Sequence, residues 1–433
     1  MRLRWLIGLL IWVSMVQAQD KMLVTDLLNV KTASAVAANK QGNKVIFLVQ
    51  EQVPDTNPWE YKYQSQLYLC ALPNGKPIQL SFSKEGVSNP RWHPDGESLF
   101  FTRNVEGKNQ IFHMSLQGGE PQQITFSKYS VGNYKILASG KELIFSTSIS
   151  LQNLVADTLL NPQQKLPTWF TEKAGFTSNE YLQQTTVKPN PNGSLSEVRA
   201  YLLQNEKDKK AKVISKLNFQ EESTTSSDIN FTHWFTQNLQ ASSKPKPITQ
   251  GFYSFNNVTP IPGTNNFFAE SKWGSNLHPD RELSVGIVKI NGTTGEVGSF
   301  LQEQGKVISI ADISPSGKTL AYLYGNTSFV SVPALATIDL QKPKLVHTYY
   351  VFDRNKNNIT FSANEGFIYF TSGTQGATVL HELNLAAFKI TALSHTESGI
   401  NSFDVLPTGF VYSKHSVAQP SDVFTSNLQG KNE

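Results

Sequence analysis

Short apolar runs alternate with turns along the chain, and the clearest repeat covers residues 86–126. A turn at residues 93–96 precedes the apolar run 99–102. An alternating run at residues 110–116 then leads, through a pair of glycines, to a last short run at residues 122–126. This order predicts four antiparallel strands within about forty residues. One sheet of that size cannot bury both of its faces, so the pattern predicts neighbouring sheets of the same kind.

Seven turns of this kind precede an apolar run, and they contain Gly42, Gly96, Gly140, Gly263, Gly317, Gly366 and Gly409. Five of the six spacings between these glycines lie between 43 and 54 residues, and the sixth is 123. We therefore predict an all-β fold, a seven-bladed β-propeller of four-stranded antiparallel blades over residues 36–433. The long spacing predicts a large insertion in the third blade, at about residues 150–230.

The N-terminus has the pattern of a secretory signal. Two arginines precede an apolar run at residues 5–13, and a small residue, Ala18, follows. This pattern predicts a signal peptide at residues 1–18, cleavage after Ala18, and export to the periplasm or the medium. An uncleaved N-terminal anchor is the alternative. No second hydrophobic segment follows, so no membrane span is expected after cleavage. Residues 19–35 are expected to form a lead-in to the propeller.

The seventh repeat ends after its third predicted strand, at residues 422–428. An exposed strand edge favours aggregation, so we expect this edge to be covered. One hypothesis places the N-terminal segment at residues 22–30 over the edge. The alternative is that another chain covers it.

Charge and composition exclude several classes of function. The formal net charge is +4 over 433 residues, too small for a nucleic-acid-binding surface. Cys70 is the single cysteine, so no intramolecular disulfide is possible, and the eight histidines form no metal-binding motif. We therefore predict no metal and no cofactor, and we expect Cys70 to be a small buried hydrophobe.

The repeat resembles a known family. The motifs WHPDG at residues 92–96, NQIF at 109–112 and QIT at 123–125 are similar to the WD40-like (PD40) repeat of TolB-like propellers and of prolyl-oligopeptidase-family (S9) serine peptidases. Residues 25–31 resemble the start of the propeller in the acylaminoacyl-peptidase and dipeptidyl-peptidase-V-like branch, and residues 402–424 resemble its last blade. The resemblance implies the propeller half of such an enzyme, which caps the active site and filters peptides by size.

The catalytic half of that family is missing from the sequence. The family's hydrolase domain follows the propeller, and its nucleophile lies in a G-x-S-x-G motif that this sequence lacks. No catalytic residue is therefore predicted, and we expect a non-catalytic chain. The resemblance implies a separately encoded α/β-hydrolase partner or a peptide or protein ligand. The alternative is a stand-alone TolB-like scaffold in the periplasm.

The loop at residues 273–282 has the composition of a binding loop. It combines Trp273, Asp280, Arg281 and Glu282 between two predicted strands of the fourth repeat. Related dipeptidyl peptidases hold the substrate's free amine with propeller carboxylates or loops, so the resemblance implies that these residues contact a peptide or a partner. Glu180 in the insertion is a weaker candidate. The alternative is an ordinary loop in which Arg281 pairs with a glutamate.

Overall fold

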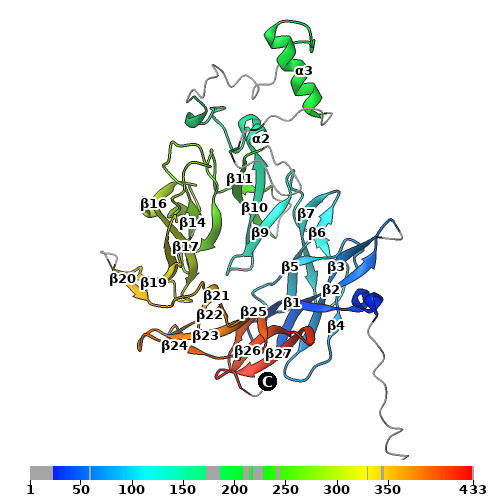
Figure 1. Cartoon of the computed structure of the whole chain (residues 1–433), viewed down its shortest axis with the longest axis vertical. Coiled ribbons are helices and arrows are strands. Elements are labelled where there is room, and N and C mark those ends of the chain that lie inside the picture. The colour runs from blue at the N-terminus through cyan, green and yellow to red at the C-terminus, as the bar shows by residue number, and fades with distance from the viewer. Residues whose placement is uncertain are drawn as a thin grey trace, which may run out of the picture.

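The computed structural model describes residues 23–57, 60–171, 186–207, 214, 216–217, 228–239, 244–328, 330–342 and 346–431. Within these ranges the chain forms seven antiparallel sheets, and the sheets follow one another around a ring in chain order (Figure 1). Six of the sheets have four strands and the seventh has three. The predicted all-β, seven-bladed propeller is therefore confirmed. The predicted signal peptide at residues 1–18 lies outside the described residues.

Each of the first four sheets is built from consecutive strands. The first contains β1 (Thr32–Ala38), β2 (Lys44–Pro54), β3 (Tyr61–Ala71) and β4 (Ile78–Gln79); the second contains β5 (Ser88–Trp92), β6 (Ser98–Val105), β7 (Lys108–Ser115) and β8 (Gln122–Gln123). The third contains β9 (Val131–Ile136), β10 (Glu142–Ser150), β11 (Asn230–Asn238) and β12 (Lys246–Pro247); the fourth contains β13 (Asn256–Pro260), β14 (Asn266–Ser271), β15 (Gly286–Asn291) and β16 (Val297–Leu301).

The last three sheets continue the same pattern. The fifth contains β17 (Lys306–Ile313), β18 (Thr319–Asn326), β19 (Ala334–Asp339) and β20 (His347–Tyr350); the sixth contains β21 (Asn357–Phe361), β22 (Phe367–Thr374), β23 (Ala377–Asn384) and β24 (Lys389–Ala392). The seventh contains β25 (Gly399–Leu406), β26 (Gly409–Ser416) and β27 (Gln419–Asn427).

The continuous apolar runs of the sequence arise because both faces of each sheet are buried. Successive side chains of a strand point to opposite faces. In β6, Phe101 lies in the cluster between the first and second sheets, whereas Phe100 lies in the cluster between the second and third. The described residues form seven such clusters, one at each boundary between neighbouring sheets. Stability therefore comes from packing between sheets rather than from one central core.

The boundary between the seventh and first sheets, which we call the seam, joins distant parts of the chain. Among the described residues no strand is exchanged across it: β27 pairs with β26, and β1 pairs with β2. Strands β25–β27 lie beside β1 in Figure 1. The N-terminal 3₁₀ helix η1 (Val24–Asn29) packs against β2. The hypothesis that this segment covers the edge of β27 is therefore wrong for residues 23–30, because the helix binds the first sheet instead.

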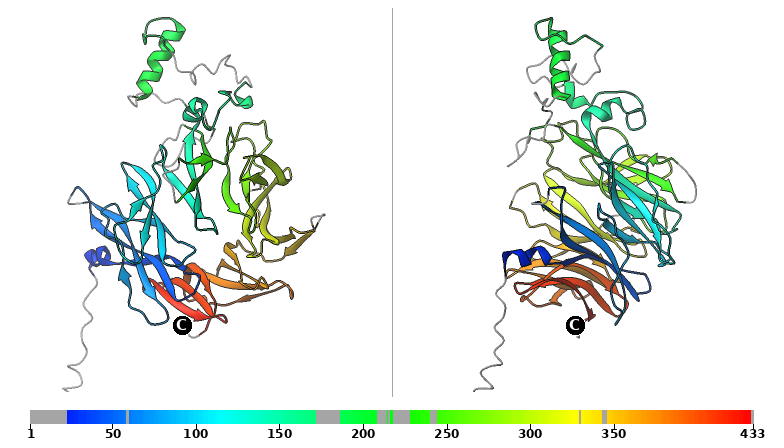
Figure 2. Two further views of the ribbon diagram at one scale, coloured as in Figure 1. Left: turned by 180° about the vertical axis from the view of Figure 1, so that it is seen from behind. Right: turned by 90° about the vertical axis from the view of Figure 1, so that its right-hand side faces the viewer.

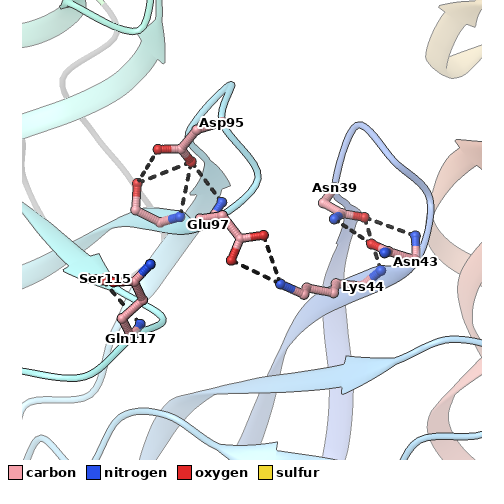
Figure 3. A network of polar contacts seen from close by, with 8 residues as sticks. Asn39, Asn43, Lys44, Asp95, Glu97, Ser115 and Gln117 are labelled. Carbon is pink, nitrogen blue, oxygen red and sulfur yellow. Dashed lines mark hydrogen bonds and ion pairs between the residues drawn. The ribbon is translucent and has the colours of Figure 1, made fainter.

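The glycine-containing turns lie together on one face of the ring, the turn face. Figure 3 shows how side chains hold two of these turns. The Asp95 carboxylate accepts the N–H of Glu97 at 2.7 Å, and the Asn39 side chain accepts the N–H of Lys44 at 3.0 Å. Lys44 Nζ then contacts Glu97 Oε1 at 3.1 Å, which links the first two sheets. The side chains of these polar residues therefore stabilise the turns and the contact between the first two sheets.

Longer connections lie on the opposite face, the loop face, because strand direction alternates within each sheet. The longest connects β10 to β11 and contains α2 (Leu151–Ala156), η2 (Thr168–Thr171) and α3 (Leu195–Lys207). Helix α3 stands away from the sheets in all three views (Figures 1 and 2). None of the helices in the described ranges has the length and apolar character that crossing a bilayer requires.

Candidate binding site

A cavity of about 760 Å³ lies on the loop face, over the third and fourth sheets. The connection after β10 forms one wall, and the loop between β14 and β15 forms another. Its apolar lining includes Leu166, Trp169, Phe231, Phe252 and Leu277, and its polar lining includes Lys216, Lys272, Asp228, Asp280 and Glu282. An apolar pocket of this size with a few polar groups is typical of ligand sites.

The wall after β10 is anchored to the third sheet. Ser150 caps the N-terminus of helix α2, where its hydroxyl accepts the N–H of Asn153 at 3.4 Å, and the helix buries Leu151 and Leu154. Further along, the Leu160 carbonyl accepts the N–H of Gly251 at 2.9 Å, on the connection between β12 and β13. These contacts fix the start of the long connection against the sheet, so this wall is part of the fold.

Trp169 connects two walls of the cavity. The residue is 8% exposed, and its ring makes a T-shaped contact with the His278 ring at a centroid distance of 4.8 Å. This contact joins η2 to the loop between β14 and β15. The Asp280 carboxylate makes a second link, since it accepts the N–H of Leu217 at 2.7 Å. The cavity is therefore enclosed by two segments that are far apart in the sequence.

The predicted carboxylate Glu282 is buried and bound within its own loop. It accepts the N–H of Ser284 at 2.7 Å and the hydroxyl of Ser275 at 3.0 Å. Burial opposes ionisation, but these hydrogen bonds and the nearby Lys272 ammonium outweigh it, and the pKa of Glu282 lies below its ordinary value. Glu282 therefore remains ionised and stabilises the loop, and it has little capacity left for a ligand amine.

The structure brings some of the predicted site residues together and separates others. Asp280 and Glu282 line the cavity. Trp273 lies beneath it, where its ring packs on Tyr253 at 4.7 Å, and it lines a smaller hollow of about 220 Å³. Arg281 lines neither of these two cavities. Glu180 lies outside the described residues.

The apolar walls of the cavity were not predicted. Trp169 has no motif around it. Leu277 lies within the predicted binding loop but was not among its predicted contact residues. The exposure of Leu277, 38%, is a surface property that the order of residues does not reveal. Among the described residues, no group of three or more His, Cys, Asp or Glu side chains is arranged to hold a metal ion.

Comparisons with known proteins match the architecture but not the sequence. No model of a known protein family matches the chain, and no curated protein sequence matches it. Solved structures do match. A complex of acylaminoacyl peptidase with Z-Gly-Gly-Phe-chloromethyl ketone superposes with a TM-score of 0.61 and 12% identity, over 93% of this chain and 52% of that chain. This chain has the fold of an S9 peptidase propeller.

Two further solved structures are similar to this chain in fold. A puromycin-hydrolysing peptidase of Mycobacterium tuberculosis matches with a TM-score of 0.60 and 9% identity, over 95% of this chain and 54% of that chain. The propeller domain of the Trilobed protease from Pyrococcus furiosus, described as having an open velcro topology, matches with a TM-score of 0.54 and 14% identity, over 91% of this chain and 95% of that domain. The chain spans about half the length of the two whole peptidases. The predicted resemblance is confirmed at the level of the propeller fold.

Proposed function

We propose that this chain is an exported, non-catalytic propeller that binds peptides at the loop-face cavity and works as the substrate-gating half of an S9-type serine peptidase. The cavity itself is the main support. Its volume of about 760 Å³ lies within the range of about 300–1,000 Å³ that is usual for small-ligand sites. Two of the matching structures are peptidases, one of them solved with a peptide chloromethyl ketone.

The chemistry of the cavity favours a short peptide with an apolar side chain. Trp169, Phe252 and Leu277 supply apolar surface, and Lys272 and Asp280 are among the charged residues of the lining. Lys272 Nζ donates to the carbonyl of Pro279 at 2.7 Å, which keeps its charge beside the cavity. The carboxylates of Asp280 and Glu282 are held by the protein's own groups, so specificity for a free N-terminal amine is not expected.

Peptide binding is tested by titrating the purified chain with fluorescently labelled Z-Gly-Gly-Phe-amide and with Gly-Gly-Phe-amide. Both are expected to bind with similar affinity. Leu277→Asp places a charge on the apolar wall and should weaken binding at least about tenfold. Leu283→Asp is the matched control, because Leu283 is 60% exposed and does not line the cavity. Absence of saturable binding, or equal effects of the two variants, would contradict the proposal.

The non-catalytic role and the partner have their own tests. The sequence contains no G-x-S-x-G motif, so the purified chain should not hydrolyse acylaminoacyl or dipeptidyl chromogenic substrates. Turnover that a serine-directed phosphonate abolishes would refute this. A separately encoded α/β-hydrolase is the proposed partner, and it should co-purify with the chain. Export is tested by cell fractionation and N-terminal sequencing, with a mature chain expected to begin at Gln19.

A further inference from the structure

The polar side chains that line the loop-face cavity fall into two groups, those that the protein itself binds and those that it leaves free. Lys272, Asp280 and Glu282 belong to the first group, because each has a hydrogen bond to another part of the wall. Asn161 belongs to it as well, since its side-chain amide donates to two backbone carbonyls. These residues hold the walls in place, so a ligand could use them only by competing with bonds that the fold already makes.

Three asparagines of the lining are free. Asn230 begins β11, Asn256 begins β13, and Asn276 lies in the loop between β14 and β15. All three are exposed, and their side chains have no hydrogen bond within the described ranges. Each amide offers two N–H donors and a carbonyl acceptor. A peptide bond offers the same kinds of group, so these side chains can bind a peptide main chain both as donors and as acceptors.

One segment, residues 253–256, holds the three asparagines around the same cavity. The Tyr253 hydroxyl donates at 3.4 Å to the carbonyl of Ser275, the residue before the loop asparagine. The N–H of Phe255 donates at 2.9 Å to the carbonyl of Thr232, two residues after the asparagine that begins β11. The third asparagine ends the segment itself. Their backbone positions are therefore fixed relative to one another before any ligand binds.

Ser271, the last residue of β14, adds a buried hydroxyl to the lining. The residue is 2% exposed, and its Oγ has no hydrogen-bond partner in the part of the chain that the structure describes. It follows Glu270, which lies opposite Asn256 in the ladder, so the hydroxyl and this asparagine lie at the same end of the fourth sheet. A buried hydroxyl without a partner destabilises a fold and is uncommon. A ligand carbonyl that accepts from Ser271 would remove that cost.

The charged residues of the lining balance. They are three lysines and three carboxylates: Lys165, Lys216, Lys272, Asp228, Asp280 and Glu282. The lining therefore has no formal net charge, and it favours neither a cationic nor an anionic ligand. The free amides and the free hydroxyl remain as the groups that can give polar specificity.

We propose that the cavity binds the main chain of an extended, uncharged peptide segment. The three asparagines and Ser271 bind its peptide N–H and C=O groups, and Leu277 contacts one apolar side chain. The ligand class is thus an internal or end-blocked stretch of peptide rather than a free terminus. A sugar is less suited to the cavity, because the Trp169 ring is buried against His278 and offers little surface for stacking. This inference rests on the proposed function and specifies how the same site recognises its ligand.

The first test changes the peptide, so that the protein is untouched. The probe is fluorescently labelled Z-Gly-Gly-Phe-amide, and its partner is the analogue in which an ester oxygen replaces the N–H before phenylalanine. The ester is expected to bind about three- to tenfold more weakly, as for the loss of one hydrogen bond. Raising NaCl from about 50 to about 500 mM should change the affinity less than about twofold, because no charge is recognised. Maltotriose in large excess should not displace the probe.

The second test changes the protein. Asn230→Ala, Asn256→Ala and Asn276→Ala are each expected to weaken binding of the probe about three- to tenfold. Asn133→Ala is the matched control, since Asn133 is an exposed asparagine of β9 that does not line the cavity. Ser271→Ala should weaken binding by a similar factor. Its melting temperature should be unchanged or higher, because the variant removes a buried hydroxyl that has no partner in the fold.

The outcomes separate this inference from the proposed function. If Leu277→Asp weakens binding but the ester and the asparagine variants do not, main-chain recognition is refuted and the proposed function stands. Absence of saturable peptide binding would refute both. Displacement by maltotriose would assign the cavity to a sugar, and a tenfold loss of affinity with salt would assign it to a charged ligand. A lower melting temperature of Ser271→Ala would show that its hydroxyl is bonded within the fold, which contradicts its proposed role.

Discussion

Replacing Asp404 with alanine removes a hydrogen bond that holds the ring closed at the seam. The Asp404 carboxylate accepts the N–H of Ala38 at 2.8 Å across the seam, and the N–H of Val405 at 2.8 Å. Inside the ring, Asp312 has the same arrangement: it accepts the N–H of Phe361 in the next sheet at 2.9 Å, as well as the N–H of the residue that follows it. Asp312→Ala is therefore a matched control for Asp404→Ala.

The apolar packing at the seam is built mostly from small and medium side chains. Its buried cluster consists of Ala33, Val36, Val45, Phe47, Leu406 and Val411, in which Phe47 is the single aromatic ring. A backbone N–H left without a partner costs about 1–3 kcal/mol. Each variant should lower the free energy of unfolding by about 2 kcal/mol. Only Asp404→Ala should also open the seam locally, because no nearby chain connection holds the first sheet against the seventh.

Hydrogen exchange measured by mass spectrometry distinguishes the two variants. A local opening made easier by about 2 kcal/mol raises the exchange rate about thirtyfold. We expect this increase in β1 and β25 for Asp404→Ala, at temperatures well below global unfolding. Asp312→Ala should leave those two strands protected. Unchanged exchange of β1 and β25 in Asp404→Ala, or the same pattern in both variants, would refute the claim that the seam is the weak boundary.

Three further changes test other parts of the ring. Burial, followed in size by repulsion from a nearby arginine, lowers the pKa of Lys135 to about 8. As the pH rises, the folded protein therefore loses this proton at a lower pH than the unfolded chain does. The free energy of unfolding of the wild type, measured with urea, should rise by up to about 3 kcal/mol between pH 8 and pH 10 relative to that of Lys135→Met. Gly42 has a φ of +68°, and an added Cβ would collide with the ring of Pro407. Gly42→Ala should therefore lower the melting temperature more than Gly107→Ala, where the φ is +80° but the space is open; equal losses would contradict this. The Trp234 indole N–H donates at 2.8 Å to the carbonyl of Phe255, the residue before β13. Trp234→Phe should therefore lower the free energy of unfolding by about 1–3 kcal/mol, and a neutral effect in thermal or urea unfolding would show that the hydrogen bond contributes nothing.

The propeller could be predicted because each repeat encodes its own sheet. Glycine turns and period-2 strands are local signals, and seven of them define the ring. The contacts between repeats were less predictable. His93 lies in one of the predicted turns, and its Nε2 lies 2.8 Å from the carbonyl of Gly140 in the next turn, with its side chain 18% exposed. A contact between sheets depends on how neighbouring turns are placed in space, which no single repeat contains.

The candidate site could be predicted only in part, for the same reason. Loop composition identified Asp280 and Glu282, which line the cavity. It did not show that Asp280 would bind the N–H of Leu217, 63 residues away. Trp169 was missed because it belongs to a connection without repeat periodicity. Composition thus locates a polar loop, whereas the enclosure of a cavity depends on contacts between distant segments.

A recurring pair of hydrogen bonds explains why outer strands of two residues are sufficient in this propeller. In the second sheet, the two ladder residues of β8 are followed at once by Ile124 and Thr125, which add two hydrogen bonds to Ile111. Each such bond contributes about 0.5–1.5 kcal/mol, which is enough when the outer strand is tethered to its own sheet.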